Sequence, residues 1–186
     1  MSSLDRILER LGTTEDANLP NVIDKLLPLV IKQLVIDVDS TVQCKVLKIL
    51  SHVNKRLEAL PNLQLPIADL ISLYQTPPSP AASNFSLLYI NKAITRAPTS
   101  TRLPYLNPLL QSIASKNEQQ QDILLRCATQ CLEGLTPSTS STVKESSVVA
   151  QSLDTLAEQD TAVFIDYILT LMLFQIQSDK APSSAL

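Results

Sequence analysis

The sequence predicts an all-α fold, an α-solenoid of helical hairpins of the HEAT or armadillo kind. The apolar residues recur at helical spacing along most of the chain, and the expected helices form pairs that repeat roughly every 40 residues. Only 2 of the 186 residues are glycine. So little glycine leaves few positions for tight turns with positive φ or for phosphate-binding loops, which argues against many-stranded β folds and nucleotide-binding folds.

The first three helices are expected at 3–11, 18–35 and 40–60. Ser3 is a suitable cap for the first helix and Gly12 a suitable end. Pro28 should kink the second helix. The third helix begins at Ser40, and its apolar stripe predicts one long core-facing side: Val42, Val46, Ile49, Leu50, Val53, Leu57 and Leu60.

Four more helices follow at 66–75, 83–97, 103–115 and 117–133. Pro66 is acceptable as the first helical residue, because a proline there loses no intrahelical hydrogen bond. The segment 83–97 has so few polar positions that we expect neighbours on more than one side of it. Residues 76–80 should separate the first two of these helices, and Lys116 alone should turn the chain between the last two.

The remaining sequence is expected to divide the chain into four parts. Residues 1–134 form the HEAT-like repeats, and 135–147 form a linker rich in serine and threonine. Residues 148–177 form a further helical segment, with a weak helix up to 157 and an apolar helix capped by Asp160. Residues 178–186 should form a disordered tail.

Composition and charge exclude several classes of function. A net charge of -3 without a long basic run argues against nucleic acid as the partner, because phosphate binding needs a basic surface. Three cysteines without a Cys-x-x-Cys pair suit a reducing compartment. The N-terminus lacks the pattern of a signal peptide. We therefore expect a protein of the cytoplasm and nucleus.

No constellation of residues predicts an enzyme, a cofactor site or a metal site. His52, the only histidine, lies two helical turns from Cys44, about 12 Å along the axis, which is too far for a hydrogen-bonded dyad. Cys127 and Cys131 share a helix face, but no second pair of ligands is near enough in sequence to complete a zinc site. A hydrolase using Cys44 or His52 stays open as an alternative that thiol reactivity would test.

One helix face is a candidate for binding a protein. Five residues of the helix at 40–60 form a basic stripe opposite its apolar stripe: Lys45, Lys48, His52, Lys55 and Arg56. On a solenoid such a ridge is suited to an acidic partner. The alternative interpretation is an ordinary solvated helix face.

The apolar helix near the C-terminus is too short to predict a membrane span. The run 162–176 is shorter than the roughly 20 apolar residues that a spanning helix needs, and it contains Asp166, Thr170 and Gln175. Its apolar residues nevertheless exceed what one neighbouring helix covers. We therefore expect the chain to self-associate through 161–176, to bind a chaperone there, or to fold this helix back on the array.

Several segments together resemble a known family. Leu26-Leu27-Pro28 followed by Asp37, Asp39 and Val42 is similar to the HEAT pattern of a kinked first helix, a turn aspartate and a second helix. The segments 51–57, 64–74 and 83–90 are similar, in order and spacing, to the N-terminus of the large HEAT-repeat adaptor and scaffold proteins of the proteasome. The resemblance covers about 4–132 and thins after Gly134, before the apolar helix resembles the family again.

This resemblance implies a non-enzymatic scaffold that binds proteasome subunits. The family holds proteasome particles together and regulates them. Its members are far longer than this chain, which would then be a fragment, a split gene or a truncated gene product. A HEAT-repeat adaptor of another kind, from transport or vesicle coats, is the alternative, and the segments within 51–90 discriminate between the two.

Overall fold

The computed structural model describes residues 3–35, 39–133, 149–151 and 153–179, with side chains up to Leu173. Within these ranges the chain consists of helices and turns and contains no strand, so the predicted all-α class is confirmed. The chain forms two compact units, Met1–Arg102 and Leu103–Leu186, and their boundary lies inside the array predicted at 1–134. The predicted linker at 135–147 lies outside the described residues.

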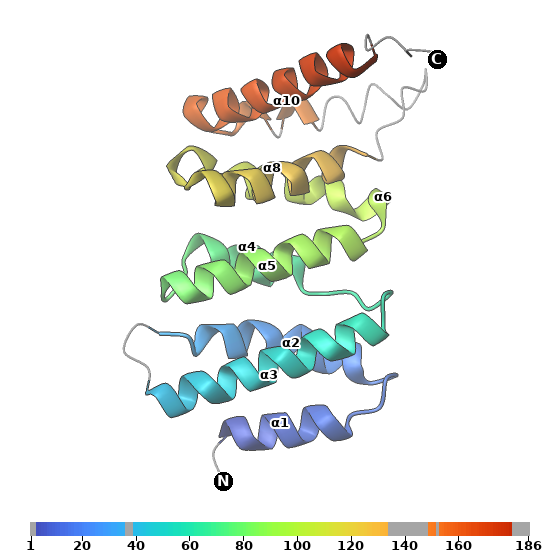
Figure 1. The fold of residues 1–186 in the computed structure, drawn as a ribbon, viewed down its shortest axis with the longest axis vertical. Coiled ribbons are helices and arrows are strands. Elements are labelled where there is room, and N and C mark those ends of the chain that lie inside the picture. The colour runs from blue at the N-terminus through green and yellow to red at the C-terminus, as the bar shows by residue number, and fades with distance from the viewer. Residues whose placement is uncertain (1–2, 36–38, 134–148, 152, 180–186) are drawn as a thin grey trace, which may run out of the picture. The chain divides into compact units, whose positions relative to one another are not determined.

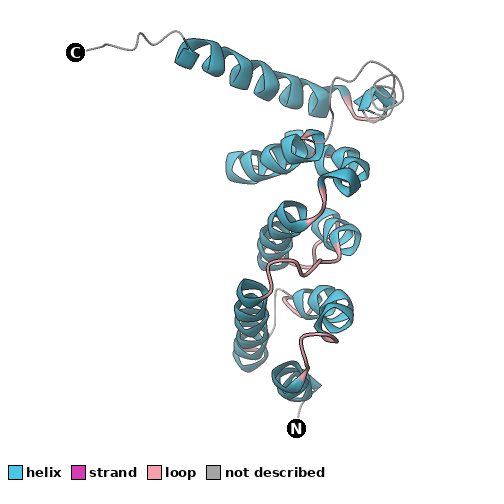
Figure 2. Cartoon of the chain, turned by 90° about the vertical axis from the view of Figure 1, so that its right-hand side faces the viewer, coloured by secondary structure: helices cyan, strands magenta, loops and turns pink. Residues whose placement is uncertain are grey.

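The first unit contains two helical hairpins and an additional helix at each end. Its helices are α1 (Ser3–Thr13), α2 (Leu19–Lys32), α3 (Ser40–Ala59), α4 (Ile67–Gln75), α5 (Pro80–Arg96) and the short α6 (Thr99–Arg102). In Figure 1, α2 and α3 run antiparallel, as do α4 and α5, which matches the first two predicted pairs. Seen from the side in Figure 2, α2 and α4 lie in one layer of this unit and α3 and α5 in the other.

The core of the first unit lies where these helices face one another. Its largest fully buried side chains are Leu11, Leu19, Ile23, Leu27, Ile31, Ile49, Leu50, Leu57, Leu70, Tyr89, Ile90 and Ile94. Helix α5 packs against both α4 and α2, as its low polarity predicted. The Tyr89 hydroxyl donates to the carbonyl oxygen of Leu50 at 3.2 Å, and this bond satisfies the polar end of a buried aromatic side chain.

Polar caps locate the helix boundaries in the first unit. Helix α3 begins at Ser40 as predicted, and the carboxylate of Asp39 caps it by accepting from the backbone N–H of Thr41. The hydrogen bond from the Thr41 hydroxyl, and after it the one from this N–H, lowers the pKa of Asp39. Helix α5 begins at Pro80, three residues earlier than predicted. The reason is Ser79, whose hydroxyl accepts from Ala82 N–H and donates to the Leu34 carbonyl at the end of α2.

The other boundaries show smaller differences from the predictions. Gly12 and Ser3 both lie inside α1, which ends at Thr13. Pro66 precedes α4 as its cap residue instead of starting the helix. Pro28 lies within α2, which continues to Lys32, and the kink at Pro28 stays a prediction. At the other end of α5, the buried Arg102 donates to the carbonyl oxygens of Ala97 and Thr95 at 2.8 and 3.2 Å.

The second unit is less regular than its sequence predicts. Its elements are the 3₁₀ turn η1 (Leu103–Tyr105), α7 (Leu106–Leu110), the 3₁₀ turn η2 (Ile113–Ser115), α8 (Glu118–Leu132) and α10 (Glu158–Asp179). The single helix predicted at 103–115 is therefore wrong. The chain breaks at Ser112, which has φ 63° in the left-handed region. Residues 149–151 and 153–154 are helical, in agreement with part of the weak predicted helix.

Asp160 of α10 forms hydrogen bonds to the turn at Ser112, where the predicted helix is interrupted. The predicted role of Asp160 as the cap of the apolar helix is wrong, because α10 already begins at Glu158. Its buried carboxylate instead accepts from the backbone N–H groups of Ser112 and Ala114, at 2.8 and 2.9 Å. Helix α10 also extends to Asp179, into the segment predicted as a disordered tail, whereas 180–186 lie outside the described residues.

The left-handed conformation of Ser112 predicts that glycine at this position stabilises the protein. A residue other than glycine costs roughly 1–2 kcal/mol in this conformation, so Ser112→Gly should raise the free energy of unfolding by up to about 1 kcal/mol. Urea unfolding followed by circular dichroism measures this change. Ser112→Ala is the matched control, because it keeps the unfavourable φ; an equal gain for alanine would show that backbone conformation is not the cause.

Candidate protein-binding surface

Helix α3 carries the basic stripe on the side opposite its core face. The stripe predicted for the core is buried at five of its positions: Val46, Ile49, Leu50, Val53 and Leu57. This burial fixes the rotation of α3. Lys48 and Lys55 consequently lie on its exposed side, whereas Lys45, His52 and Arg56 are half-buried at the edges.

Lys45 binds within the first unit. Its Nζ lies 2.8 Å from Oδ1 and 2.9 Å from Oδ2 of Asp5, so the ion pair links α3 to α1 across a partly exposed contact. An exposed pair of this kind contributes about 0–1 kcal/mol to stability. Lys45 therefore helps to position α1 against α3.

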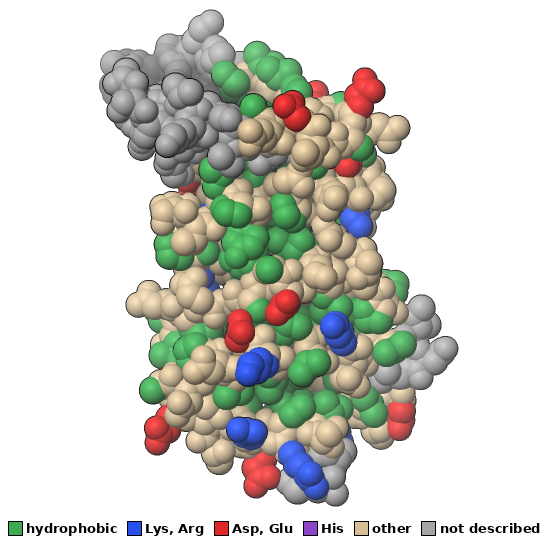
Figure 3. All heavy atoms as spheres, turned by 180° about the vertical axis from the view of Figure 1, so that it is seen from behind, with side chains coloured by type: hydrophobic (Ala, Val, Ile, Leu, Met, Phe, Trp, Pro, Cys, Tyr) green, Lys and Arg blue, Asp and Glu red, His purple; other side chains and the backbone are tan. Residues whose placement is uncertain are grey.

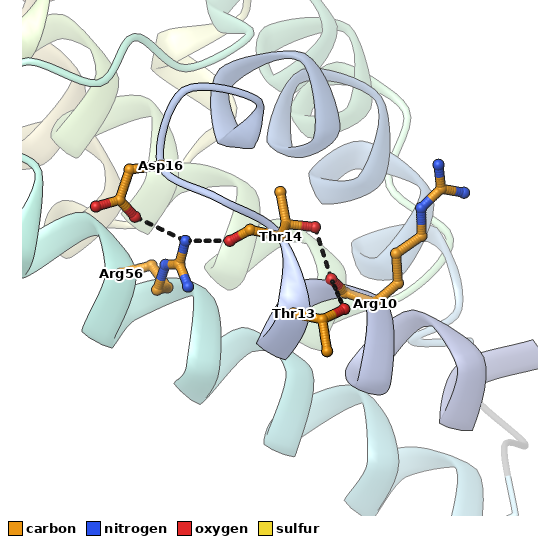
Figure 4. A network of polar contacts seen from close by, with 5 residues as sticks. All are labelled: Arg10, Thr13, Thr14, Asp16 and Arg56. Carbon is orange, nitrogen blue, oxygen red and sulfur yellow. Dashed lines mark hydrogen bonds and ion pairs between the residues drawn. The ribbon is translucent and has the colours of Figure 1, made fainter.

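Arg56 forms hydrogen bonds to the loop between α1 and α2 (Figure 4). Its Nη2 donates to the carbonyl oxygen of Thr14 at 2.7 Å and to Oδ1 of Asp16 at 2.8 Å. The same loop is closed by the Thr14 hydroxyl, which donates to the Arg10 carbonyl at 2.6 Å. Arg56 thus satisfies a backbone acceptor just after α1, where the helix supplies no further N–H donors.

Two residues of the stripe, Lys45 and Arg56, therefore bind other residues of the first unit, whereas Lys48 and Lys55 do not within its described part. Lys48 and Lys55 form no ion pair with any residue that the structure describes. They lie seven positions apart on α3, about 10 Å along the axis at 1.5 Å per residue. The Nδ1 atom of His52 is buried and has no hydrogen-bond partner in the described ranges. Protein binding by this stripe stays a prediction, and Lys48 and Lys55 are the residues best placed for it.

Two basic residues of α5 extend the polar side of α3, and the sequence analysis missed both. Lys92 donates to Oδ1 of Asn54 at 2.9 Å and lies 5.9 Å from the centre of the Tyr89 ring. Arg96 donates to the carbonyl oxygen of Leu57 at 2.9 Å. No local signal in the sequence reveals these contacts, because they depend on how α5 packs against α3.

The three cysteines differ in their exposure to solvent. Cys44 is exposed on α3, whereas Cys127 and Cys131 are buried in α8. Burial, with a smaller contribution from Cys131, raises the pKa of the Cys127 thiol to about 12. The thiol is therefore protonated at neutral pH and is a poor nucleophile or metal ligand. Across the described ranges, no three His, Cys, Asp or Glu side chains come together as metal ligands would.

Helix α10 presents an apolar face to solvent. It contacts α7 and η2 within the second unit, and Phe164 is buried on that side. Five large apolar side chains are exposed: Ile165, Leu169, Leu171, Met172 and Leu173. In the described part of the chain, no helix has the combination of length and hydropathy required to cross a membrane. Self-association through this face stays a prediction.

Comparison with known proteins shows that the chain matches one protein family. The family described as the N-terminal region of the proteasome component ECM29 matches residues 4–185. The chain belongs to this family. The match includes both units of the structure, and it continues past Gly134, where the resemblance noted from the sequence thins. The basic stripe of α3 and the apolar helix α10 both lie within the ECM29 N-terminal region.

A curated relative from Homo sapiens is described as the proteasome adapter and scaffold protein ECM29. It is 34% identical to this chain over 127 residues, which are 67% of this chain and 7% of the relative. The chain therefore spans a small part of the length of the relative it matches. No solved structure shows significant similarity to it.

Proposed function

We propose that this chain is a non-enzymatic protein-binding segment of a proteasome adaptor and scaffold. The observation that carries the proposal is the match to the ECM29 N-terminal family over residues 4–185. The human relative, itself described as a proteasome adapter and scaffold, supports the same role. Helical hairpins such as those of the first unit also offer an extended surface that is suited to binding proteins.

The binding surface that we assign to this function is the exposed side of α3. Lys48 and Lys55 offer two positive charges without a partner in the described structure, and an acidic patch on a proteasome subunit would complement them. We assign the protein to the cytoplasm and nucleus, for which the odd number of cysteines is suitable. A transport or vesicle-coat adaptor is the less favoured function, because the family match extends over nearly the whole chain.

Binding to purified proteasome particles tests this function. The full chain, immobilised through an affinity tag, is incubated separately with the proteolytic core particle and with the regulatory particle. Saturable capture of at least one particle, competed by untagged chain, is the expected result. Capture of neither particle at low ionic strength would contradict the proposal.

Charge reversal on α3 tests the binding surface. The variant Lys48→Glu/Lys55→Glu should lower the affinity for the captured particle by about threefold to tenfold, because both residues would face acidic groups. Its melting temperature should stay close to that of the parent chain, since exposed charges contribute little to stability.

The matched control is Arg6→Glu/Lys32→Glu, which changes the net charge equally at exposed positions of α1 and α2. Equal losses of binding in the two variants would show that net charge, rather than the α3 surface, determines capture. Lys45→Glu is unsuitable here because it breaks the ion pair with Asp5.

A further inference from the structure

A second surface of the first unit has the form of a binding groove. Helices α1 and α2 border an open groove of about 410 Å³. Helix α1 contributes Ile7 and Arg10, and α2 contributes Val22, Lys25, Leu26 and Leu29. None of the described residues of α3 lines the groove, so the groove does not include the basic stripe.

The wall formed by α2 carries apolar side chains at helical spacing, of which Val22 and Leu26 are half-buried and Leu29 is exposed. Leu29 is 59% exposed, although its neighbours Leu27, Pro28 and Val30 are buried. Val22, Leu26 and Leu29 stand at positions i, i+4 and i+7, so they form one stripe about 10 Å long. Figure 3 shows apolar side chains interspersed with both Lys or Arg and Asp or Glu side chains over the lower part of the view.

The charged residues that line this groove are both basic. Arg10 and Lys25 line it, and no carboxylate is among its lining residues. Neither side chain forms an ion pair or hydrogen bond with a residue that the structure describes. The guanidinium of Arg10 points away from the network around Arg56 in Figure 4, although the Arg10 carbonyl takes part in it. Two unpaired cations therefore border an apolar wall.

We propose that this groove binds a short amphipathic helix that carries carboxylates beside its apolar face. A groove between two helices accepts the ridge of side chains of a third helix, and apolar residues at i, i+3, i+4 and i+7 of such a ligand would meet Val22, Leu26 and Leu29. Glutamate or aspartate on the flanks would reach Arg10 and Lys25, and Arg10 can bind a carboxylate through two parallel hydrogen bonds.

The structure favours this occupant over others by charge and by size. A basic helix would bring like charges against Arg10 and Lys25. The stripe of about 10 Å corresponds to about two turns of a ligand helix, so a segment of three to four turns is long enough to bind. The site differs from the α3 surface, and its occupation does not depend on the proposed proteasome contact.

Three synthetic peptides of equal length and helicity provide the probes. The first has a leucine face flanked by glutamate, the second has lysine in place of each glutamate, and the third is the first with a central proline. Each carries a fluorophore and is titrated with the full chain while fluorescence polarisation is measured. Methyl NMR spectra of the full chain, labelled at Ile, Leu and Val, locate the bound peptide.

We expect the acidic peptide to bind at least tenfold more tightly than the basic peptide and the proline peptide. Its methyl shifts should concentrate on Ile7, Val22, Leu26 and Leu29. Arg10→Glu/Lys25→Glu should remove this preference and favour the basic peptide. Leu29→Glu, at an exposed position, should weaken binding of the acidic peptide at least tenfold without lowering the melting temperature.

The control variant is Lys48→Glu/Lys55→Glu, which should bind the acidic peptide like the parent chain. Equal affinity for the acidic and basic peptides would overturn the proposal, as would methyl shifts confined to α10. Undiminished binding of the proline peptide would show that the ligand is extended rather than helical and would also overturn it. Proteasome capture is measured independently on α3 variants, so failure here leaves that function standing.

Discussion

We predict that the chain self-associates through α10 and that replacing Leu169 and Met172 by glutamate makes it a monomer. These residues are 53% and 56% exposed and lie on the same apolar face of α10 as Ile165. Apolar area contributes about 25 cal/mol per Å² when it is removed from water, so covering these exposed side chains by a second copy of the chain favours association. Sedimentation velocity over a range of concentrations measures the change in the average molecular mass.

The structure decides which α10 residues are suitable for this experiment. Phe164 is buried within the second unit, so a polar residue there would destabilise this unit rather than report on association. The control is Gln159→Glu/Thr170→Glu, which adds the same charge at exposed polar positions of α10. A parent chain that sediments as a monomer at every concentration, with freely exchanging α10 amides, would contradict self-association.

Asp160→Ala is expected to destabilise the second unit by about 3 kcal/mol. The carboxylate accepts two backbone hydrogen bonds, from Ser112 and Ala114, in a buried position. Hydrogen bonds to a charged group contribute about 1.5–3 kcal/mol each, and removing the acceptor leaves both N–H groups without a partner. The turn between α7 and α8 would then lose its link to α10.

Urea unfolding and amide hydrogen exchange measure this effect together. Exchange should accelerate at Ser112 and Ala114 before it does in the core of α8. Asp160→Asn should cost less, because one side-chain oxygen still accepts a hydrogen bond. Asp154→Ala, at an exposed position, is the control. Equal stability of Asp160→Ala and Asp154→Ala would show that the two hydrogen bonds contribute nothing.

The candidate binding surface was only partly predictable from the sequence. The spacing of the basic residues on α3 correctly placed Lys48 and Lys55 on an exposed side. It also grouped Lys45 and Arg56 with them, although these residues bind Asp5 and Asp16, both about 40 positions away in sequence. A helical pattern identifies the face of a residue, but it does not identify which charges of another helix reach that face.

The sequence by itself determined the all-α class, the core face of α3 and the family, because these depend on local periodicity and on residue identity along the chain. Only the tertiary structure decided that the predicted helix at 103–115 is interrupted at Ser112 and that Asp160 stabilises this turn by accepting two backbone hydrogen bonds. The same holds for the groove between α1 and α2 and for which apolar residues of α10 are exposed. Each of these features depends on contacts between segments distant in sequence, and such contacts leave no periodic signal in either segment.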